Sequence, residues 1–338
     1  MEATVVVTIF SKTQVPPTTW AEHITALVPH IEASLALNPS SPMQRFLDGT
    51  SSSGHRVLEL RFPSPSTKTQ SECTSAAHAL SAQAVPLGLS LVLQPLSSLH
   101  KLSPSKAKRL AVFDMDSTLI QQEVIDELAR EVGVYSAVAA ITEAAMRGDA
   151  QYADFTASLR ARVALLKGVD GGVWDRLKSK VVSFTPGARE LVKCLKRDGW
   201  SAAVLSGGFV PLAEWVQAEL GLDYARANRL ETDFEGRLTG RLQEGAEIVD
   251  GERKRALLGE IARQEGVQGV ATLAVGDGSN DLLMMGEAAL GVAFNAKPRV
   301  QERAPAVVNS ESLVDVLYVL GWTEAEIQAV VGETEKSH

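Results

Sequence analysis

Short apolar runs alternate with longer amphipathic stretches along the last two thirds of the chain. Four runs of mainly β-branched and small apolar residues predict buried strands, at 110–113, 202–205, 272–275 and 291–294. Stretches with apolar residues at helical spacing lie between them, including 187–197, 210–220 and 253–264. Strands that alternate with helices predict an α/β fold, in which helices cover both faces of a parallel sheet.

The first hundred residues follow a different order. Strands are predicted at 4–10, 56–62 and 87–93, helices at 19–32 and 70–84, and a weaker strand near 33–37. This βαββαβ order is typical of a small ferredoxin-like α+β domain. A packing or dimerisation module fits the pattern, and so does a domain that senses an amino acid.

Charge and composition predict a domain boundary near residue 100. Residues 1–100 hold only five Lys or Arg and six Asp or Glu, of the 33 and 41 in the whole chain. A short, basic and polar stretch at 101–109 then precedes the first apolar run of the α/β pattern. We therefore expect an N-terminal domain at 1–100, a linker at 101–109 and a second domain at 110–338.

Composition excludes several classes of protein. The chain of 338 residues is 45% hydrophobic with a net charge of -8, so it can bury a core and would repel nucleic acid and acidic membranes. No apolar run reaches the roughly 18–20 residues that cross a bilayer. The chain has two cysteines, and its start lacks the pattern of a secretory signal. We expect a cytoplasmic protein without a disulfide framework or zinc cluster.

The histidines are distributed unevenly, and this narrows the possible chemistry. Five of the six lie in the first hundred residues and the sixth ends the chain, so 101–337 contains none. A site in that stretch therefore lacks the base of Ser-His-Asp and Cys-His mechanisms, and it lacks histidine ligands for zinc. Carboxylate, lysine and hydroxyl chemistry remains.

Acidic residues directly follow two of the predicted strands. Asp114 and Asp116 come after 110–113, and Asp277 and Asp281 come after 272–275. In parallel sheets, ligands bind at the carboxyl ends of the strands, where these carboxylates would meet. Crowded carboxylates repel one another unless a cation or proton lies between them. A set of oxygen donors without histidine or thiolate favours Mg²⁺.

A third predicted strand ends in residues suited to an anion. Ser206 supplies a hydroxyl group, Gly207 and Gly208 supply open main-chain N–H groups, and a lysine would add positive charge. Donors of this kind around a divalent cation are typical of sites that bind a phosphoryl group. A carboxylate can attack phosphorus and form an aspartyl-phosphate.

Four motifs in this order resemble the haloacid dehalogenase (HAD) superfamily and, within it, the phosphoserine phosphatases. They are Asp-Met-Asp-Ser-Thr-Leu at 114–119, Ser-Gly-Gly-Phe at 206–209, Lys254, and Gly-Asp-Gly-Ser-Asn-Asp at 276–281. The resemblance runs from about Arg109 to Leu320. It implies a HAD-like, Rossmannoid core with a small helical cap, and in outline it makes the N-terminal domain ACT-like.

The resemblance implies roles for the four carboxylates. Asp114 would be the nucleophile that becomes phosphorylated. Asp116 would protonate the leaving oxygen, then deprotonate the hydrolytic water, and would also offer Mg²⁺ its main-chain carbonyl. Asp277 would bind Mg²⁺ directly, with Asp281 as a ligand or as a close neighbour. Relatives that are not phosphatases lack the second acid of the first motif, so Asp116 favours a phosphatase.

The remaining motif residues would bind the phosphoryl group. The resemblance implies that Ser206, Gly207 and Lys254 hold its oxygens and that Asn280 orients them. A lysine considered alone would usually be solvated on its helix, but its position between the second and fourth motifs favours a site residue.

Residues 121–184 separate the first two motifs, with helical spacing at 123–132, 136–146, 152–166 and 173–182. In this superfamily such an insert forms a cap that closes over the site and excludes water. The resemblance implies that Glu123 pairs with the substrate ammonium and that Arg162 holds its carboxylate. Met146 and Phe155 would form an apolar wall.

We therefore expect Mg²⁺-dependent hydrolysis of O-phospho-L-serine to L-serine and phosphate through an aspartyl-phosphate, the last step of phosphorylated serine biosynthesis. The expected partner is this small substrate, with no nucleic acid or membrane, and a homodimer is possible. Two alternatives stay open. One is a phosphatase or phosphotransferase for another small phosphomonoester, and the other is an inactive regulatory protein that binds an amino acid.

Overall fold

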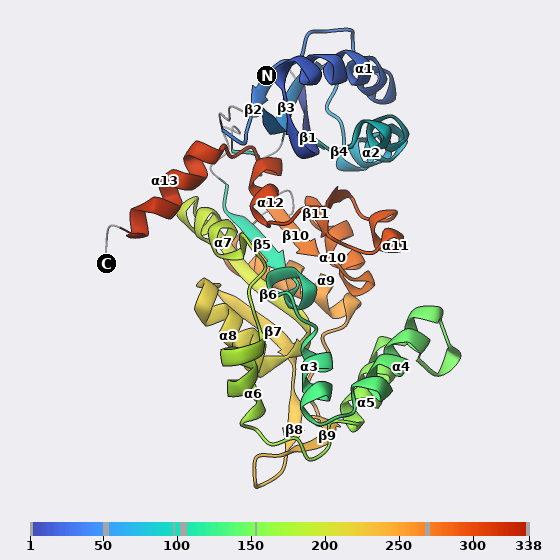
Figure 1. Cartoon of the computed structure of the whole chain (residues 1–338), viewed down its shortest axis with the longest axis vertical. Coiled ribbons are helices and arrows are strands. Elements are labelled where there is room, and N and C mark those ends of the chain that lie inside the picture. Colours follow the sequence, from blue (N-terminus) through green and yellow to red (C-terminus); the bar gives the residue numbers. More distant parts are fainter. Residues whose placement is uncertain are drawn as a thin grey trace.

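The computed structural model describes residues 3–49, 54–96, 99–101, 107–152, 154–267 and 271–335. A small α+β unit lies at one end of the molecule, and the α/β unit with its cap forms the rest (Figure 1). Residues 102–106 of the expected linker lie outside the described residues, and the exact boundary stays a prediction. No helix of the described parts is long and apolar enough to cross a membrane.

The N-terminal unit has the predicted βαββαβ order. Its elements are β1 (Ala3–Val15), α1 (Pro17–Leu35), β2 (Met43–Phe46), β3 (His55–Ser64), α2 (Gln70–Ala84) and β4 (Leu89–Pro95). The strands form an antiparallel sheet in the order β2-β3-β1-β4. The capping box that Thr69 forms with Glu72 explains the start of α2.

The strand expected near 33–37 was wrong. Residues 33–35 continue α1, and the helix ends at Ala36, which has a left-handed φ of 49°. The second strand of the unit is β2, ten residues further along, where Met43 and Gln44 are exposed at the sheet edge. Apolar content alone did not distinguish the last turn of a buried helix from a strand.

The second unit is built on a six-stranded sheet in the order β12-β11-β10-β5-β6-β7. Every neighbouring pair is parallel. The strands are β5 (Arg109–Phe113), β6 (Trp200–Phe209), β7 (Tyr224–Asn228), β10 (Thr272–Gly276), β11 (Leu290–Phe294) and β12 (Ala306–Val308). All residues of β10 and β11 are buried, as in a parallel sheet covered on both faces.

Helices connect these strands, and two more follow the last strand. They are α7 (Ala188–Arg197), α8 (Val210–Leu220), α9 (Gly251–Glu265), α10 (Leu282–Glu287), α11 (Pro298–Gln301), α12 (Val314–Val319) and α13 (Glu324–Glu335). The predicted α/β class is confirmed. Both edge strands, β7 and β12, and the last two helices were not predicted from the sequence.

Two excursions leave the carboxyl edge of this sheet. The first holds α3 (Val124–Glu131), α4 (Tyr135–Arg147), α5 (Phe155–Ala164) and α6 (Val173–Arg176), followed by a π-type turn at Leu177–Val181. An antiparallel bridge joins Ile120 to Phe184 where this cap leaves the core and returns. The second is a hairpin of β8 (Leu230–Thr232) and β9 (Leu238–Leu242), which lies beside the cap at the end of the molecule opposite the N-terminal unit (Figure 1).

The N-terminal sheet packs against the C-terminal helices. Phe10, Val57 and Val92 belong to the same apolar cluster as α12. Arg56 donates to the buried carboxylate of Asp315, and Gln94 Nε2 donates to the Val319 carbonyl at 2.6 Å. One face of the sheet is therefore occupied within the chain.

Candidate active site

Three strand ends bring the predicted motifs to one place. Asp114 follows β5, Asp277 follows β10, and Ser206 and Gly207 lie near the end of β6. β5 lies between the other two strands in the sheet. The main-chain N–H of Asp114 donates to the Val275 carbonyl at 2.9 Å, which continues the pairing of β5 with β10 up to the first motif. The fold itself thus aligns the motifs.

Asp114, Asp277 and Asp281 form a tight acidic group. One carboxylate oxygen from each lies within 4.8 Å of the others. Lys254 Nζ is fully buried and lies 2.8 Å from Asp114 Oδ1 and 2.7 Å from Asp281 Oδ1. When all four groups are ionised, three negative charges face one positive charge. A divalent cation would neutralise the difference, and the all-oxygen donor set fits a hard ion.

The surroundings of each carboxylate differ. Asp281 Oδ2 accepts a hydrogen bond from the Gly278 N–H at 2.9 Å, and its Oδ1 is held by Lys254. Asp277 Oδ1 accepts from Thr118 Oγ1 at 2.9 Å, and Asp114 Oδ1 accepts from the Met115 N–H at 2.7 Å. Both oxygens of Asp281 are already engaged, so Asp114 and Asp277 are better placed to bind a cation directly.

Burial and mutual repulsion perturb this group. Burial raises the pKa of Asp114, and the neighbouring Asp281 raises it further. Burial and Asp281 also raise the pKa of Asp277, to about 7. Burial alone would lower the pKa of Lys254, but Asp114 and Asp281 outweigh it, so the pKa is raised and the ammonium stays charged. A bound cation would favour the ionised carboxylates.

Asp116 lies two residues after Asp114, but its carboxylate does not belong to the group formed by the other three aspartates. Its Oδ1 is buried and has no partner among the described residues, while Oδ2 accepts a long hydrogen bond of 3.4 Å from the Val124 N–H. Burial raises its pKa well above the usual value, and Glu123 adds to the effect. A protonated carboxyl with an unpaired buried oxygen is suited to donate a proton to a bound substrate.

The end of β6 has no room for larger residues. A Cβ atom on Gly208 would lie 3.0 Å from Asp116 Oδ2, and one on Gly207 would lie 3.1 Å from the ring of Phe155. The same Gly207 position is 3.7 Å from the side-chain nitrogen of Asn280. Phe155 of the cap therefore lies directly over the glycine that was predicted to hold phosphate.

Two residues of this region were missed from the sequence. Asn228 is buried at the end of β7, where its Nδ2 donates to the Gly207 carbonyl at 2.8 Å and its Oδ1 accepts from the Val249 N–H at 2.9 Å. Thr118, which holds Asp277, lies inside the first motif and could have been singled out there. Asn228 carried no such signal, because β7 was not recognised as a strand.

Of the predicted cap residues, Phe155 and Arg162 lie on α5, and Glu123 lies directly before α3. Arg162 is partly buried, and its Nε donates to the Ser158 carbonyl at 3.3 Å. No carboxylate of the described residues lies within ion-pair distance of its guanidinium. Burial lowers the pKa of Arg162, opposed by Glu123, Asp126 and Asp116. Its charge is thus available to a ligand.

Glu123 and Met146 are placed differently. Glu123 Oε1 accepts from Ser117 Oγ at 2.6 Å, and Ser117 has a left-handed φ of 54°. Met146 is 50% exposed, and its sulfur lies 3.4 Å from Lys297 Nζ on the core. Met146 therefore lies at the rim between cap and core, whereas Phe155 lies over Gly207 in the interior.

The fold and the site define a HAD-like hydrolase. The family model of haloacid dehalogenase-like hydrolases matches residues 111–286, and the chain belongs to this family. A probable phosphoserine phosphatase of Schizosaccharomyces pombe is 52% identical over 223 residues, which cover 66% of this chain and 73% of that protein. The fold and family expected from the four motifs are confirmed.

Solved structures extend the likeness. A substrate-bound phosphoserine phosphatase is 41% identical, with a TM-score of 0.58 over 64% of this chain and 99% of that one. A probable phosphoserine phosphatase of Vibrio cholerae, in unliganded form, is 27% identical with a TM-score of 0.62. That match covers 98% of this chain and 89% of the other, so it includes the N-terminal unit.

Proposed function

We propose that the chain hydrolyses O-phospho-L-serine to L-serine and phosphate with the help of Mg²⁺. The observation that carries the proposal is the arrangement at the mouth of the site. Arg162 of the cap has no ion pair among the described residues, and its charge and that of Glu123 both act on Asp116, whose buried Oδ1 has no described partner beside the acidic group. The relatives named phosphoserine phosphatase support the same substrate.

The charges around the cap match a phosphorylated amino acid. Such a substrate carries an anionic phosphoryl group, an ammonium and a carboxylate. Arg162 can hold the carboxylate with two N–H groups, and Glu123 can accept from the ammonium. Ser206, Gly207 and Lys254 would bind phosphoryl oxygens, and Asn280 would orient them. Phe155, and Met146 at the rim, would keep water out.

Asp114 is the proposed nucleophile. Its Oδ1 is held by Lys254 and the Met115 N–H, so Oδ2 is the oxygen that attacks phosphorus. The new O–P bond forms as the bond from phosphorus to the serine oxygen breaks. Asp116 gives its proton to that oxygen, which releases L-serine. Asp116 then takes a proton from water, and the hydroxide attacks phosphorus to release phosphate and restore Asp114.

The donor set for a metal is Asp114, Asp277 and the main-chain carbonyl of Asp116, with Asp281 held beside them by Lys254. Mg²⁺ bound there would supply positive charge to the phosphoryl oxygens. Lys254 lowers the pKa of Asp114 and so opposes burial and Asp281, which favours the ionised form that attacks. We propose that the reaction takes place in the cytoplasm, because two buried cysteines without a disulfide fit a reducing compartment. A homodimer also stays a prediction.

One experiment separates the proposal from its rivals. Phosphate release is measured with phosphoserine, phosphothreonine and phosphohomoserine, with and without Mg²⁺ and acceptor alcohols. The proposal expects Mg²⁺-dependent hydrolysis with preference for phosphoserine. A faster reaction with another phosphomonoester, or transfer to the alcohol, would favour the first alternative. No phosphate release with any substrate would favour an inactive regulatory protein.

Asp114→Asn tests the assignment of the nucleophile. We expect turnover to be lost while circular dichroism and the thermal midpoint stay close to those of the wild type. Substantial activity in this variant would exclude Asp114 as the group that attacks phosphorus.

A further inference from the structure

The β8–β9 hairpin is bonded to the cap. The Gly168 N–H donates to the Leu238 carbonyl at 2.8 Å, and the Leu238 N–H donates to the Val169 carbonyl at 2.8 Å. Leu238 and Val169 are both buried. The hairpin therefore adds two main-chain hydrogen bonds and an apolar contact to the loop that follows α5.

A close approach of backbones strengthens this contact. Gly240 of β9 has a φ of 81°, and a Cβ atom there would lie 3.0 Å from the Ala164 carbonyl and from Lys167 Cβ. Ala164 ends α5, the helix that carries Phe155 and Arg162. The hairpin thus packs against the end of the helix that carries two of the cap residues proposed to contact the substrate.

The root of the hairpin, by contrast, is attached to the core through few residues. The Gln243 N–H donates to the Arg229 carbonyl at 2.9 Å and closes the hairpin. Asn228, just before this pair, is fixed to Gly207 and to Val249. Residues 244–248 connect Gln243 to the anchored Val249. Glu247 in this segment pairs with Arg253 of α9 at 2.7 Å, whereas a Cβ atom on Gly245 would meet nothing within 4 Å.

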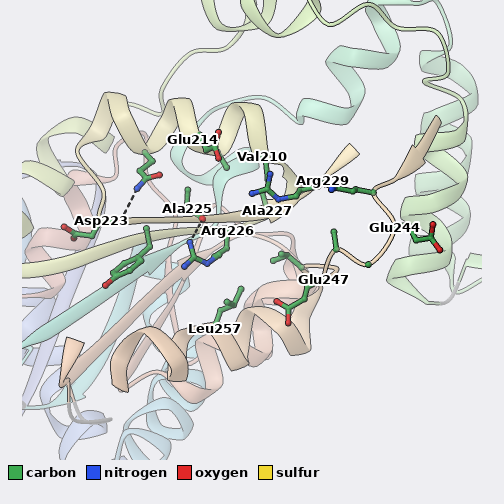
Figure 2. A pocket seen from close by; sticks show the side chains of 17 residues that line it. Val210, Glu214, Asp223, Ala225, Arg226, Ala227, Arg229, Glu244, Glu247 and Leu257 are labelled. Carbon is green, nitrogen blue, oxygen red and sulfur yellow. Dashed lines mark hydrogen bonds between the residues drawn. The ribbon is translucent and has the colours of Figure 1, made fainter. Parts of the chain in front are cut away.

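An open groove of about 600 Å³ lies at this root, between α8, β7 and residues 243–249. Figure 2 shows Arg229, Glu244 and Glu247 at the end of the groove where the hairpin begins, and Val210 and Glu214 on α8 across from them. The root therefore has free space beside it, while the tip and β9 are held by the cap.

We infer that the β8–β9 hairpin is a working part of the cap, which positions α5 and its Arg162 and moves with the cap about a root at Arg229 and Gln243. The inference rests on the proposed function only for the role of Arg162. When the cap opens, the bonds between Leu238 and the cap stay intact, and the bending occurs at 243–246 beside the groove, before the pair of Glu247 with Arg253 of α9.

A reversible crosslink tests the shared motion. Lys167→Cys with Gly240→Cys suits a disulfide after a small shift, because an ideal Cβ atom at 240 would lie 3.0 Å from Lys167 Cβ, about 0.5 Å below the short end of the usual disulfide range. Hydrolysis of p-nitrophenyl phosphate is compared before and after dithiothreitol, and this readout does not depend on phosphoserine being the substrate. We expect rates within twofold of each other. An oxidised protein more than tenfold slower, restored by dithiothreitol, would mean that the hairpin stays with the core and would overturn the inference.

Two glycine variants test the positioning of α5. Gly240→Ala and Gly199→Ala impose similar backbone strain, since φ is 81° and 78°, but only the first meets the cap, and Gly199 lies after α7, outside the hairpin and its root. We expect Gly240→Ala to raise KM for phosphoserine at least fivefold, with KM for p-nitrophenyl phosphate unchanged, and Gly199→Ala to change neither. Equal effects of both variants, or equal effects on both substrates, would overturn the inference. If phosphoserine is no substrate at all, the proposed function fails, and the crosslink result still decides the motion.

Discussion

Lys254 provides the sharpest test of the electrostatics of the site. Its ammonium is fully buried at 2.8 Å from Asp114 and 2.7 Å from Asp281. At an effective dielectric constant of about 20, each contact is worth about 6 kcal/mol of Coulomb energy before the cost of burying the ammonium is subtracted. Lys254→Met removes this charge and leaves three carboxylates facing one another. One of them then holds a proton near neutral pH, and Asp114, whose pKa is already raised by burial, is a principal candidate.

We expect kcat of Lys254→Met to fall by roughly 10²–10³, or about 3–4 kcal/mol of transition-state stabilisation. The acid limb of the pH–rate profile should also move to higher pH, because deprotonation of the nucleophile has become harder. Phosphate release is measured from pH 5 to 9 at saturating Mg²⁺, with the fold checked by circular dichroism. Arg255→Met is the matched control. Arg255 is the next residue on the same helix, and among the described residues it pairs with exposed Glu252. The kcat of this variant should stay within twofold of the wild-type value. A Lys254→Met enzyme with near wild-type kcat and an unmoved acid limb would refute the reasoning.

Three further predictions concern the cap, the metal and the unit interface. Arg162→Ala should raise KM for phosphoserine at least tenfold and leave KM for p-nitrophenyl phosphate unchanged. Arg160 is exposed on the same helix, and Arg160→Ala should alter neither KM. Equal effects of Arg162→Ala on both substrates would show that Arg162 does not recognise the carboxylate. Chelation with EDTA should abolish phosphate release, and Mg²⁺ should restore it; activity that survives chelation would contradict a metal-dependent site. Glu59→Gln should lower the free energy of unfolding by about 3 kcal/mol at pH 7 in urea titrations, because buried Glu59 binds Arg45 and His100. Burial raises the pKa of Glu59, but His100 and Arg45 together lower it by more, so the net pKa is lowered. The stability that Glu59 contributes is therefore present above about pH 4.5 and is lost as the pH falls through the lowered pKa. A difference between wild type and variant that persists unchanged at pH 3 would contradict the assignment.

The parts of the fold that the sequence predicted are those with a continuous buried pattern. β5, β10 and β11 are buried on both faces, so each reads as an apolar run, and the runs of β5 and β10 end directly at a motif. β7 and β8 have mostly half-exposed residues, and β12 has only three residues, so none of them produces such a run. Edge strands and short hairpins are stabilised by tertiary contacts with the elements that pack on them. The local sequence pattern holds no information about those contacts.

The same contrast applies to the site. Asp114 and Asp277 directly follow strands whose carboxyl ends meet in space, and Lys254 belongs to the motif on α9 that lies between them in the chain. Asn228 acts through contacts with residues about twenty positions away on both sides, at Gly207 and Val249. The packing of the N-terminal sheet depends on pairs such as Arg56 with Asp315, separated by 259 positions. Such long-range contacts require the tertiary structure.

The central claim is that the Asp114 carboxylate takes the phosphoryl group from the substrate. The most direct measurement mixes the enzyme with ³²P-labelled phosphoserine and Mg²⁺ and quenches with acid within milliseconds. Protein-bound label is counted in one portion, and the acyl phosphate of a second portion is reduced with borohydride, which releases the phosphate, before peptide mass spectrometry. The account predicts label bound to the protein and conversion of residue 114 to homoserine. Hydrolysis that proceeds with no protein-bound label, or with the label on a different residue, would contradict it.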